Sequence, residues 1–204
     1  MDSTAVPEAS HAIAARGLGL PITYLSIRPH EDDSGRVKFD TATEGFAKLD
    51  DFAWAIIKVA GEVGARMAEG ATSTDALFNW FNEGGDAEDA RSFIARVGVD
   101  ELGNRRLATL KAYGLLRTLW DQVEAVAAKL ERSTTLLGVE LEEICKRIEL
   151  RKQGWNDSEI RAGSRKLSKA QAWAEIAKRS PRGAMKVAAW KRAATEDKPI
   201  PERR

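Results

Sequence analysis

Apolar side chains recur every three or four residues between Asp40 and Gln153, and this helical spacing constrains the fold more than any other feature. The first stripe consists of Phe46, Leu49, Ala53, Ile56, Ile57, Ala60, Val63 and Met67. Two further stripes consist of Leu116, Leu119, Trp120, Val123, Val126 and Leu130, and of Leu137, Leu141, Ile144 and Ile148. Each stripe predicts a helix with one buried face, so we expect a mainly α fold built as a helical bundle.

The helical stretch from about residue 100 to residue 153 is too long for one ordinary helix, which usually has roughly 8–20 residues. The cluster Ser133-Thr134-Thr135 and the nearby Gly138 predict a break between two helices. Gly154 predicts the end of the second one, because glycine readily takes the left-handed conformation that terminates helices.

Strand-like sequence occurs at residues 22–28 and 36–39, where β-branched and aromatic residues gather. The segment 29–35 between them is rich in Pro, Asp, Ser and Gly, which favour turns. The sequence therefore predicts one small β-hairpin near the N-terminus.

The chain is expected to have four parts. Residues 1–19, rich in Ala, Ser and Gly, are interpreted as a flexible N-terminal arm. Residues 20–153 form an acidic, mainly helical body with the hairpin at 22–39. Residues 154–195 form a basic helical segment, and residues 196–204 a loose tail.

The composition favours a soluble protein of a reducing compartment. No apolar stretch approaches the roughly 20 residues that a membrane span needs, and the N-terminus lacks the basic start and apolar run of a secretory signal. The single cysteine, Cys145, excludes an internal disulfide. We therefore expect a cytoplasmic protein without a membrane partner.

The net charge of +1 conceals a strong division along the chain. Residues 1–144 carry 15 Lys and Arg against 24 Asp and Glu, a net charge of −9. Residues 145–204 carry 17 against 7, a net charge of +10. Such an asymmetry indicates a polyanionic partner, or a contact between the acidic and basic parts.

The basic part intersperses its cations with tryptophans, which suits nucleic acid, because cations neutralise phosphates and exposed aromatic rings stack on bases. The candidate nucleic-acid-binding residues are Arg147, Arg151, Lys152, Trp155, Arg161, Arg165, Lys166, Lys169, Lys178, Arg179, Arg182, Lys186, Lys191 and Arg192. Trp173 and Trp190 match the apolar sides of short helices and are interpreted as core. The competing interpretation is that the basic part docks on the acidic part or on an acidic protein.

No catalytic constellation is recognisable. The Walker phosphate loop, the GxSxG elbow and the HExxH zinc signature are absent. Neither His11 nor His30 has an evident metal-binding partner, and Cys145, among apolar helix positions, is interpreted as a buried small hydrophobe. The run His30-Glu31-Asp32-Asp33 is interpreted as a solvated turn rather than a cation site. We therefore expect no enzyme activity, no metal and no cofactor.

The segment at 168–195 resembles a helix-turn-helix unit. Its core, 173–190, has the small Ala177 where two helices would cross, and the apolar Val187 and Trp190 on the second helix. Pro181 replaces the usual turn glycine, which departs from the pattern. In that family the second helix enters the major groove. This would place near DNA the residues Arg182, Ala184, Lys186 and Lys191.

The overall profile resembles the helical small subunits of CRISPR effector complexes of the Cascade type. The similarity consists of a compact helical body with apolar stripes between Leu116 and Ile148, basic faces, no catalytic set and a comparable size. It implies a ribonucleoprotein subunit that contacts guide or target strands through their backbones.

Three functions stay open. The first is a non-catalytic subunit of a larger nucleoprotein assembly, bound to partner proteins and to RNA or single-stranded DNA, with duplex DNA as the alternative ligand. The second is a helix-turn-helix regulator or a plasmid- or phage-type accessory protein. The third is a helical adaptor for an acidic protein.

Overall fold

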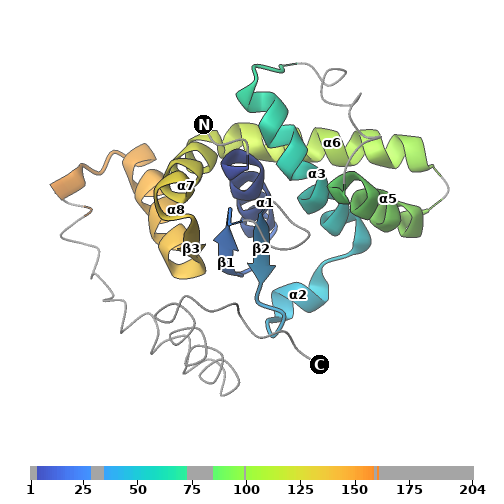
Figure 1. Ribbon diagram of the computed structural model, residues 1–204, viewed down its shortest axis with the longest axis horizontal. Coiled ribbons are helices and arrows are strands. Elements are labelled where there is room, and N and C mark those ends of the chain that lie inside the picture. Colours follow the sequence, from blue (N-terminus) through green and yellow to red (C-terminus); the bar gives the residue numbers. More distant parts are fainter. Residues whose placement is uncertain (1–3, 29–34, 73–84, 99, 159, 161–204) are drawn as a thin grey trace. The chain divides into compact units, whose positions relative to one another are not determined.

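The computed structural model describes residues 4–28, 35–72, 85–98, 100–158 and 160. The chain divides into two compact units, Met1–Gln153 and Gly154–Arg204. The first unit is called the body below. Its described part is mainly helical and contains one small antiparallel sheet, which confirms the expected fold class (Figure 1).

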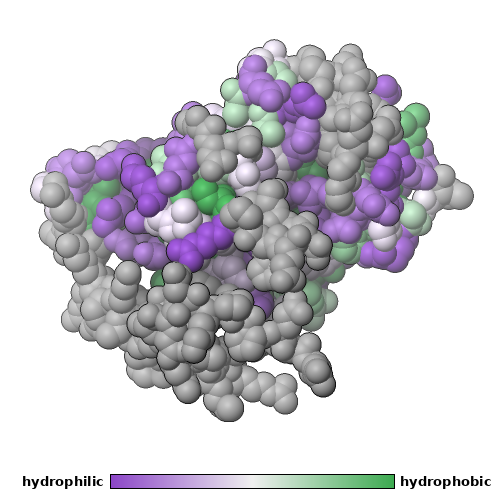
Figure 2. All heavy atoms as spheres, in the orientation of Figure 1, coloured by the Kyte–Doolittle hydropathy of each residue, from purple (hydrophilic) through white to green (hydrophobic). Residues whose placement is uncertain are grey.

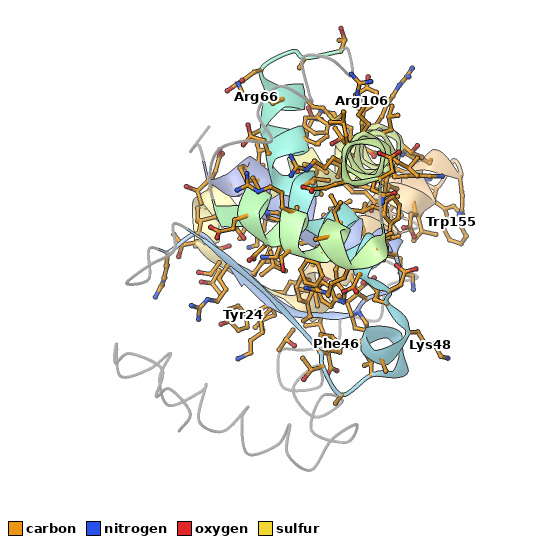
Figure 3. All side chains as sticks on the ribbon, turned by 90° about the vertical axis from the view of Figure 1, so that its right-hand side faces the viewer. Tyr24, Phe46, Lys48, Arg66, Arg106 and Trp155 are labelled. Atoms are coloured by element: carbon orange, nitrogen blue, oxygen red, sulfur yellow. The ribbon has the colours of Figure 1, made fainter. Side chains whose placement is uncertain are left out.

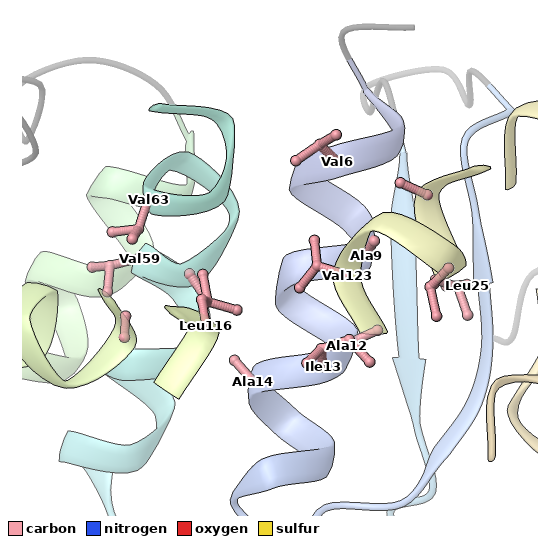
Figure 4. Packing of buried hydrophobic residues seen from close by; sticks show 14 of the residues in the cluster. Val6, Ala9, Ala12, Ile13, Ala14, Leu25, Val59, Val63, Leu116 and Val123 are labelled. Atoms are coloured by element: carbon pink, nitrogen blue, oxygen red, sulfur yellow. The ribbon is translucent and has the colours of Figure 1, made fainter. Parts of the chain in front are cut away.

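Helix α1 (Ala5–Gly17) lies in the middle of the body and packs against helix α3 (Asp51–Ala68) and helix α7 (Trp120–Ser133). Every residue from Ala9 to Ala15 is buried, and Ile13 is fully covered (Figure 4). The expectation of a flexible arm at 1–19 is therefore wrong for residues 5–17. Alanine is the strongest helix former and lets neighbouring helices approach closely, so an Ala-rich segment can be a central helix.

Two glycines of α3 face α1 and allow this close approach. A Cβ atom on Gly61 would overlap the ring of His11, and one on Gly64 would overlap the side chain of Ser10. Any larger residue at either position would push the two helices apart. The close packing of α1 on α3 therefore depends on these two glycines.

The expected hairpin is present as strands β1 (Ile22–Ser26) and β2 (Arg36–Phe39). A third strand, β3 (Thr135–Leu137), pairs with the other edge of β1 and gives the order β2-β1-β3. The sequence predicted only a helix break at this place. Leu25 of β1 is fully buried and belongs to the main core, whereas Tyr24 lies on the sheet face turned away from α3 (Figure 3).

The other helices follow the predicted stripes with two differences. The first stripe runs through two helices, α2 (Glu44–Lys48) and α3, because the carboxylate of Asp50 caps a new helix by accepting the Ala53 N–H at 2.7 Å. The long stretch is broken at 134–137 as predicted, but also at Leu119. Its helices are α6 (Glu101–Thr118), α7 and α8 (Gly138–Lys152). Helix α5 (Gly85–Val97) precedes them.

The end of α8 agrees with the sequence. Gly154 has a φ of +90°, in the left-handed region that favours glycine, two residues after the helix ends.

Two groups of apolar side chains hold the body together. The larger one joins α1, α3, α5, α6, α7, α8 and the sheet. The smaller one contains Ala15, Leu20 and Ile57, with Trp54 beside it. The Trp54 ring lies 5.3 Å from Phe39, 5.4 Å from Phe46 and 6.0 Å from Phe93, measured between centroids. The described surface in Figure 2 is mostly hydrophilic with scattered hydrophobic patches.

Candidate functional site

Four of the fourteen candidate nucleic-acid-binding residues are described by the structure. Arg147, Arg151 and Lys152 lie on α8, and Trp155 follows it. The other ten lie outside the described residues: Arg161, Arg165, Lys166, Lys169, Lys178, Arg179, Arg182, Lys186, Lys191 and Arg192. The helix-turn-helix-like segment at 168–195 and the run at 30–33 also lie outside them.

Two of the candidate cations on α8, Arg147 and Lys152, make internal ion pairs. Arg147 pairs with Glu143 one turn earlier at 2.6 Å. Lys152 pairs with Asp121 of α7 at 3.0 Å and lies 3.5 Å from the Thr118 carbonyl oxygen. These two residues therefore stabilise α8 and its contact with α7. Trp155 is 45% exposed, so its ring is accessible to a ligand.

A second ion-pair cluster joins α1 to α8. The Arg16 guanidinium contacts Glu142 and Glu149, each at 3.0 Å. Beside it lies a shallow hollow of about 640 Å³ between the ends of α1 and α6. The only charged residues that line this hollow, Arg16 and Glu142, are paired with each other, so it offers no uncompensated charge to a ligand.

His11 is the most unusual polar residue of the described core. It is 7% exposed, and both of its ring nitrogens face acceptors. Nδ1–H donates to the Ile57 carbonyl oxygen at 2.7 Å, and Nε2–H donates to Asp86 Oδ2 at 3.1 Å. When Asp86 is ionised, neither partner can donate, so the two contacts together are best satisfied by a ring that carries a proton on both nitrogens.

The pair is extended by Lys58 of α3. Its ammonium lies 3.4 Å from Asp86 Oδ1 and 2.6 Å from Asp89 Oδ2. Three helices therefore meet at one charged cluster: α1 through His11, α3 through Lys58, and α5 through Asp86 and Asp89. This cluster is called the His11 cluster below.

The pKa values of the His11 cluster follow from this geometry. Burial alone would lower the pKa of His11, but the hydrogen bond and charge of Asp86, together with Glu8, raise it above 6.5. Burial alone would raise the pKa of Asp86, but His11 and Lys58 lower it to about 2. Both shifts therefore favour the charged forms of the two residues.

Cys145 is buried, as expected. Burial raises the pKa of its thiol to about 12, despite the opposing charge of Arg16. A thiol that stays protonated is a poor nucleophile, so Cys145 behaves as a small apolar residue.

The sequence interpretation assigned no partner to His11, although Glu8, three residues earlier on the same helix, also raises its pKa. No sequence spacing indicates Asp86, 75 residues away. Among the described residues, no group of three or more His, Cys, Asp or Glu side chains could hold a metal ion.

Comparisons with models of known protein families and with curated protein sequences gave no match. None of the described helices is both long and apolar enough to cross a membrane.

Proposed function

We propose that this protein is a non-catalytic nucleic-acid-binding subunit of a larger nucleoprotein assembly, and that residues 154–204 make the contact without strong sequence preference. The observation that carries the proposal is the distribution of charge between the two compact units. Residues 154–204 hold 13 Lys and Arg against 6 Asp and Glu, a net charge of +7, whereas residues 1–153 have a net charge of −6. A polyanion is therefore attracted to residues 154–204 and repelled by residues 1–153.

The ion pairs of the body support this assignment. Many of its cations already compensate its own carboxylates: Arg16, Lys58, Arg66, Arg96, Arg105, Arg147 and Lys152. These cations are less available to phosphates. The proposed interface therefore shifts from α8 to the basic unit, with the exposed Trp155 at its start as a stacking residue. The similarity to CRISPR small subunits stays a hypothesis about which assembly is involved.

The test compares full-length variants by fluorescence anisotropy with labelled single-stranded RNA, single-stranded DNA and duplex DNA. One variant replaces Arg161, Arg165, Lys166 and Lys169 by glutamine. A matched control replaces four exposed cations of the body by glutamine: Lys111, Arg117, Arg132 and Lys146. Both variants lose four positive charges, so any difference between them reports position rather than net charge.

We expect the first variant to bind at least about tenfold more weakly than the control, since each phosphate contact adds to counterion release. The strand type that binds best identifies the ligand. Equal loss in both variants would show that binding follows total charge, and no binding by the wild-type chain at low salt would favour the adaptor for acidic proteins.

A further inference from the structure

We propose that helix α6 is a self-association surface, on which a second copy of this chain packs its own α6 in antiparallel orientation. The inference goes beyond the proposed function, because it concerns the body and not residues 154–204. It rests on the exposed apolar side chains of α6, on their spacing, and on the charges at the two ends of the same helix.

The first step concerns apolar exposure. Five large apolar side chains are exposed among the residues that the structure describes, and three of them belong to α6. These are Leu102 at 58%, Leu107 at 43% and Leu110 at 47%. Single exposed leucines are normal on a protein surface, whereas a group of them on one helix is typical of an interaction site.

The second step concerns spacing. Leu107 and Leu110 share one stripe of α6 with Gly103 and Gly114, at successive intervals of four, three and four residues. These intervals are those of the seam between two paired helices. The stripe faces away from the body, because Ala112 on the opposite side of α6 is fully buried. It is called the outer stripe below.

The third step concerns the glycine at the end of the outer stripe. Nothing lies within 4 Å of the place that a Cβ atom of Gly114 would take, so no described neighbour in the body requires a glycine there. Glycine nevertheless destabilises the interior of a helix relative to alanine. Close approach of a helix from outside the body gives a glycine at this position a use.

The fourth step identifies the occupant through charge. Asp100 precedes α6 and Arg117 lies in its last turn, and both residues are exposed. They lie seven residues before Leu107 and seven residues after Leu110. In an antiparallel pair with Leu107 facing Leu110 of the second copy, Asp100 therefore faces Arg117 of the second copy, at both ends of the seam. A parallel pair in register would instead bring like charges together, and antiparallel helix dipoles add to the preference.

The size of this contact sets its strength. A helix of 18 residues is about 27 Å long, and one pair of such helices covers less than the roughly 1,200–2,000 Å² of a stable interface. The isolated chain is therefore expected to be monomeric at low micromolar concentration and to pair when it is concentrated, as it would be within an assembly.

The test is sedimentation equilibrium of the full-length chain without nucleic acid, from about 10 µM to about 1 mM. Wild type is compared with Leu110→Glu, on the outer stripe, and with Leu102→Glu, to one side of it. Leu102 is the more exposed of the two leucines, so the control loses at least as much exposed apolar surface and gains the same charge. Circular dichroism verifies that both variants are folded.

The orientation is measured between two nitroxide labels, one on each copy of Thr118→Cys. The native Cys145 is buried and stays unlabelled. In the antiparallel pair, residue 118 lies level with residue 99 of the second copy, so the two labels are 19 residues apart along the helix axis. This corresponds to about 28 Å, whereas a parallel pair would place the labels about 10 Å apart.

We expect wild type to dimerise with a dissociation constant between about 100 µM and about 1 mM. Leu110→Glu should weaken the dimer at least about tenfold, because the residue occurs twice in a symmetric contact, and Leu102→Glu should change it by less than about twofold. The proposal is overturned if wild type stays monomeric at about 1 mM, which would leave the outer stripe to another partner. Equal weakening by both variants, or labels about 10 Å apart, would also overturn it. None of these outcomes bears on nucleic-acid binding, because no nucleic acid is present.

Discussion

At the scale of single residues, His11 has the most demanding environment in the described core. A buried charge is destabilising unless it is paired and hydrogen-bonded, and His11 satisfies both conditions through Ile57 and Asp86. Removal of one partner from such a pair leaves the other charge partly uncompensated. The free energy of unfolding therefore falls by more than the pair contributes to it in the native protein. This makes the pair a sensitive reporter of pH.

Substitution of His11 by leucine should lower the free energy of unfolding by about 1–3 kcal/mol near pH 6, because the Ile57 carbonyl loses its donor and Asp86 keeps only Lys58. The raised pKa of His11 stabilises the fold fully below its unfolded value of about 6.5, and this stabilisation is lost as the pH rises through the folded value. The lowered pKa of Asp86 acts in the opposite direction. Its stabilisation is present above about pH 4 and is lost as the pH falls towards 2.

The measurement is urea unfolding of wild type and His11→Leu between pH 3 and pH 9. The difference between them should be largest at about pH 4 to 6.5 and should shrink on both sides. A difference that falls steadily as the pH drops below about 6.5 would instead mean that the buried histidine stays neutral, because the unfolded histidine would then bind a proton that the folded one does not.

Replacement of glycine by alanine should have opposite effects on stability at Gly61 and at Gly114. Gly61→Ala should destabilise the body by about 1–3 kcal/mol, since the new Cβ overlaps the His11 ring and forces α1 and α3 apart. Gly114→Ala, within α6, should stabilise it by about 0.5–1 kcal/mol, because nothing lies within contact distance of the new methyl group and alanine is the better helix former. Thermal unfolding of both variants, measured together, decides whether the α1–α3 contact is as close as described.

At the scale of elements, sequence patterns were reliable where a helix or strand buries one face. The hairpin and helices α3, α7 and α8 follow directly from their apolar spacing. Helix α1 was misread because its central turns, from Ala9 to Ala15, are buried on every side, and a helix covered all round shows no apolar stripe. Strand β3 was missed because three residues carry no readable period and its partner lies about 110 residues away.

The central position of α1 can be measured with a matched pair of truncations. Ile13→Ala should lower the free energy of unfolding by about 2–5 kcal/mol, since the side chain is fully buried. Leu107→Ala on α6 removes a side chain that is 43% exposed. It should change the free energy of unfolding by no more than about 0.5 kcal/mol. Similar small effects from both substitutions would mean that α1 is the loose arm that its composition first suggested.

At the scale of the whole molecule, the division of charge could be read from the sequence, but the partners of individual cations could not. Arg147 and Lys152 were assigned to nucleic acid because they belong to a basic region. Their carboxylate partners, Glu143 and Asp121, became evident only from the arrangement of α7 and α8. Net charge therefore predicts that a polyanion is attracted, whereas local pairing decides which cations remain available to it.

This distinction gives a quantitative expectation for the wild-type chain. If the net charge of +7 of residues 154–204 sets the number of phosphates neutralised, the logarithm of the affinity for single-stranded RNA should fall with the logarithm of salt concentration with a slope of about −5. Binding would then weaken about 1000-fold between 50 and 200 mM salt, as titrations at four salt concentrations would measure. If all 13 cations took part, the slope would approach about −9. A slope shallower than about −1 would mean that the cations of residues 154–204 are paired with carboxylates instead of phosphates. Binding of an acidic protein would then explain the positive charge of this unit better than binding of nucleic acid.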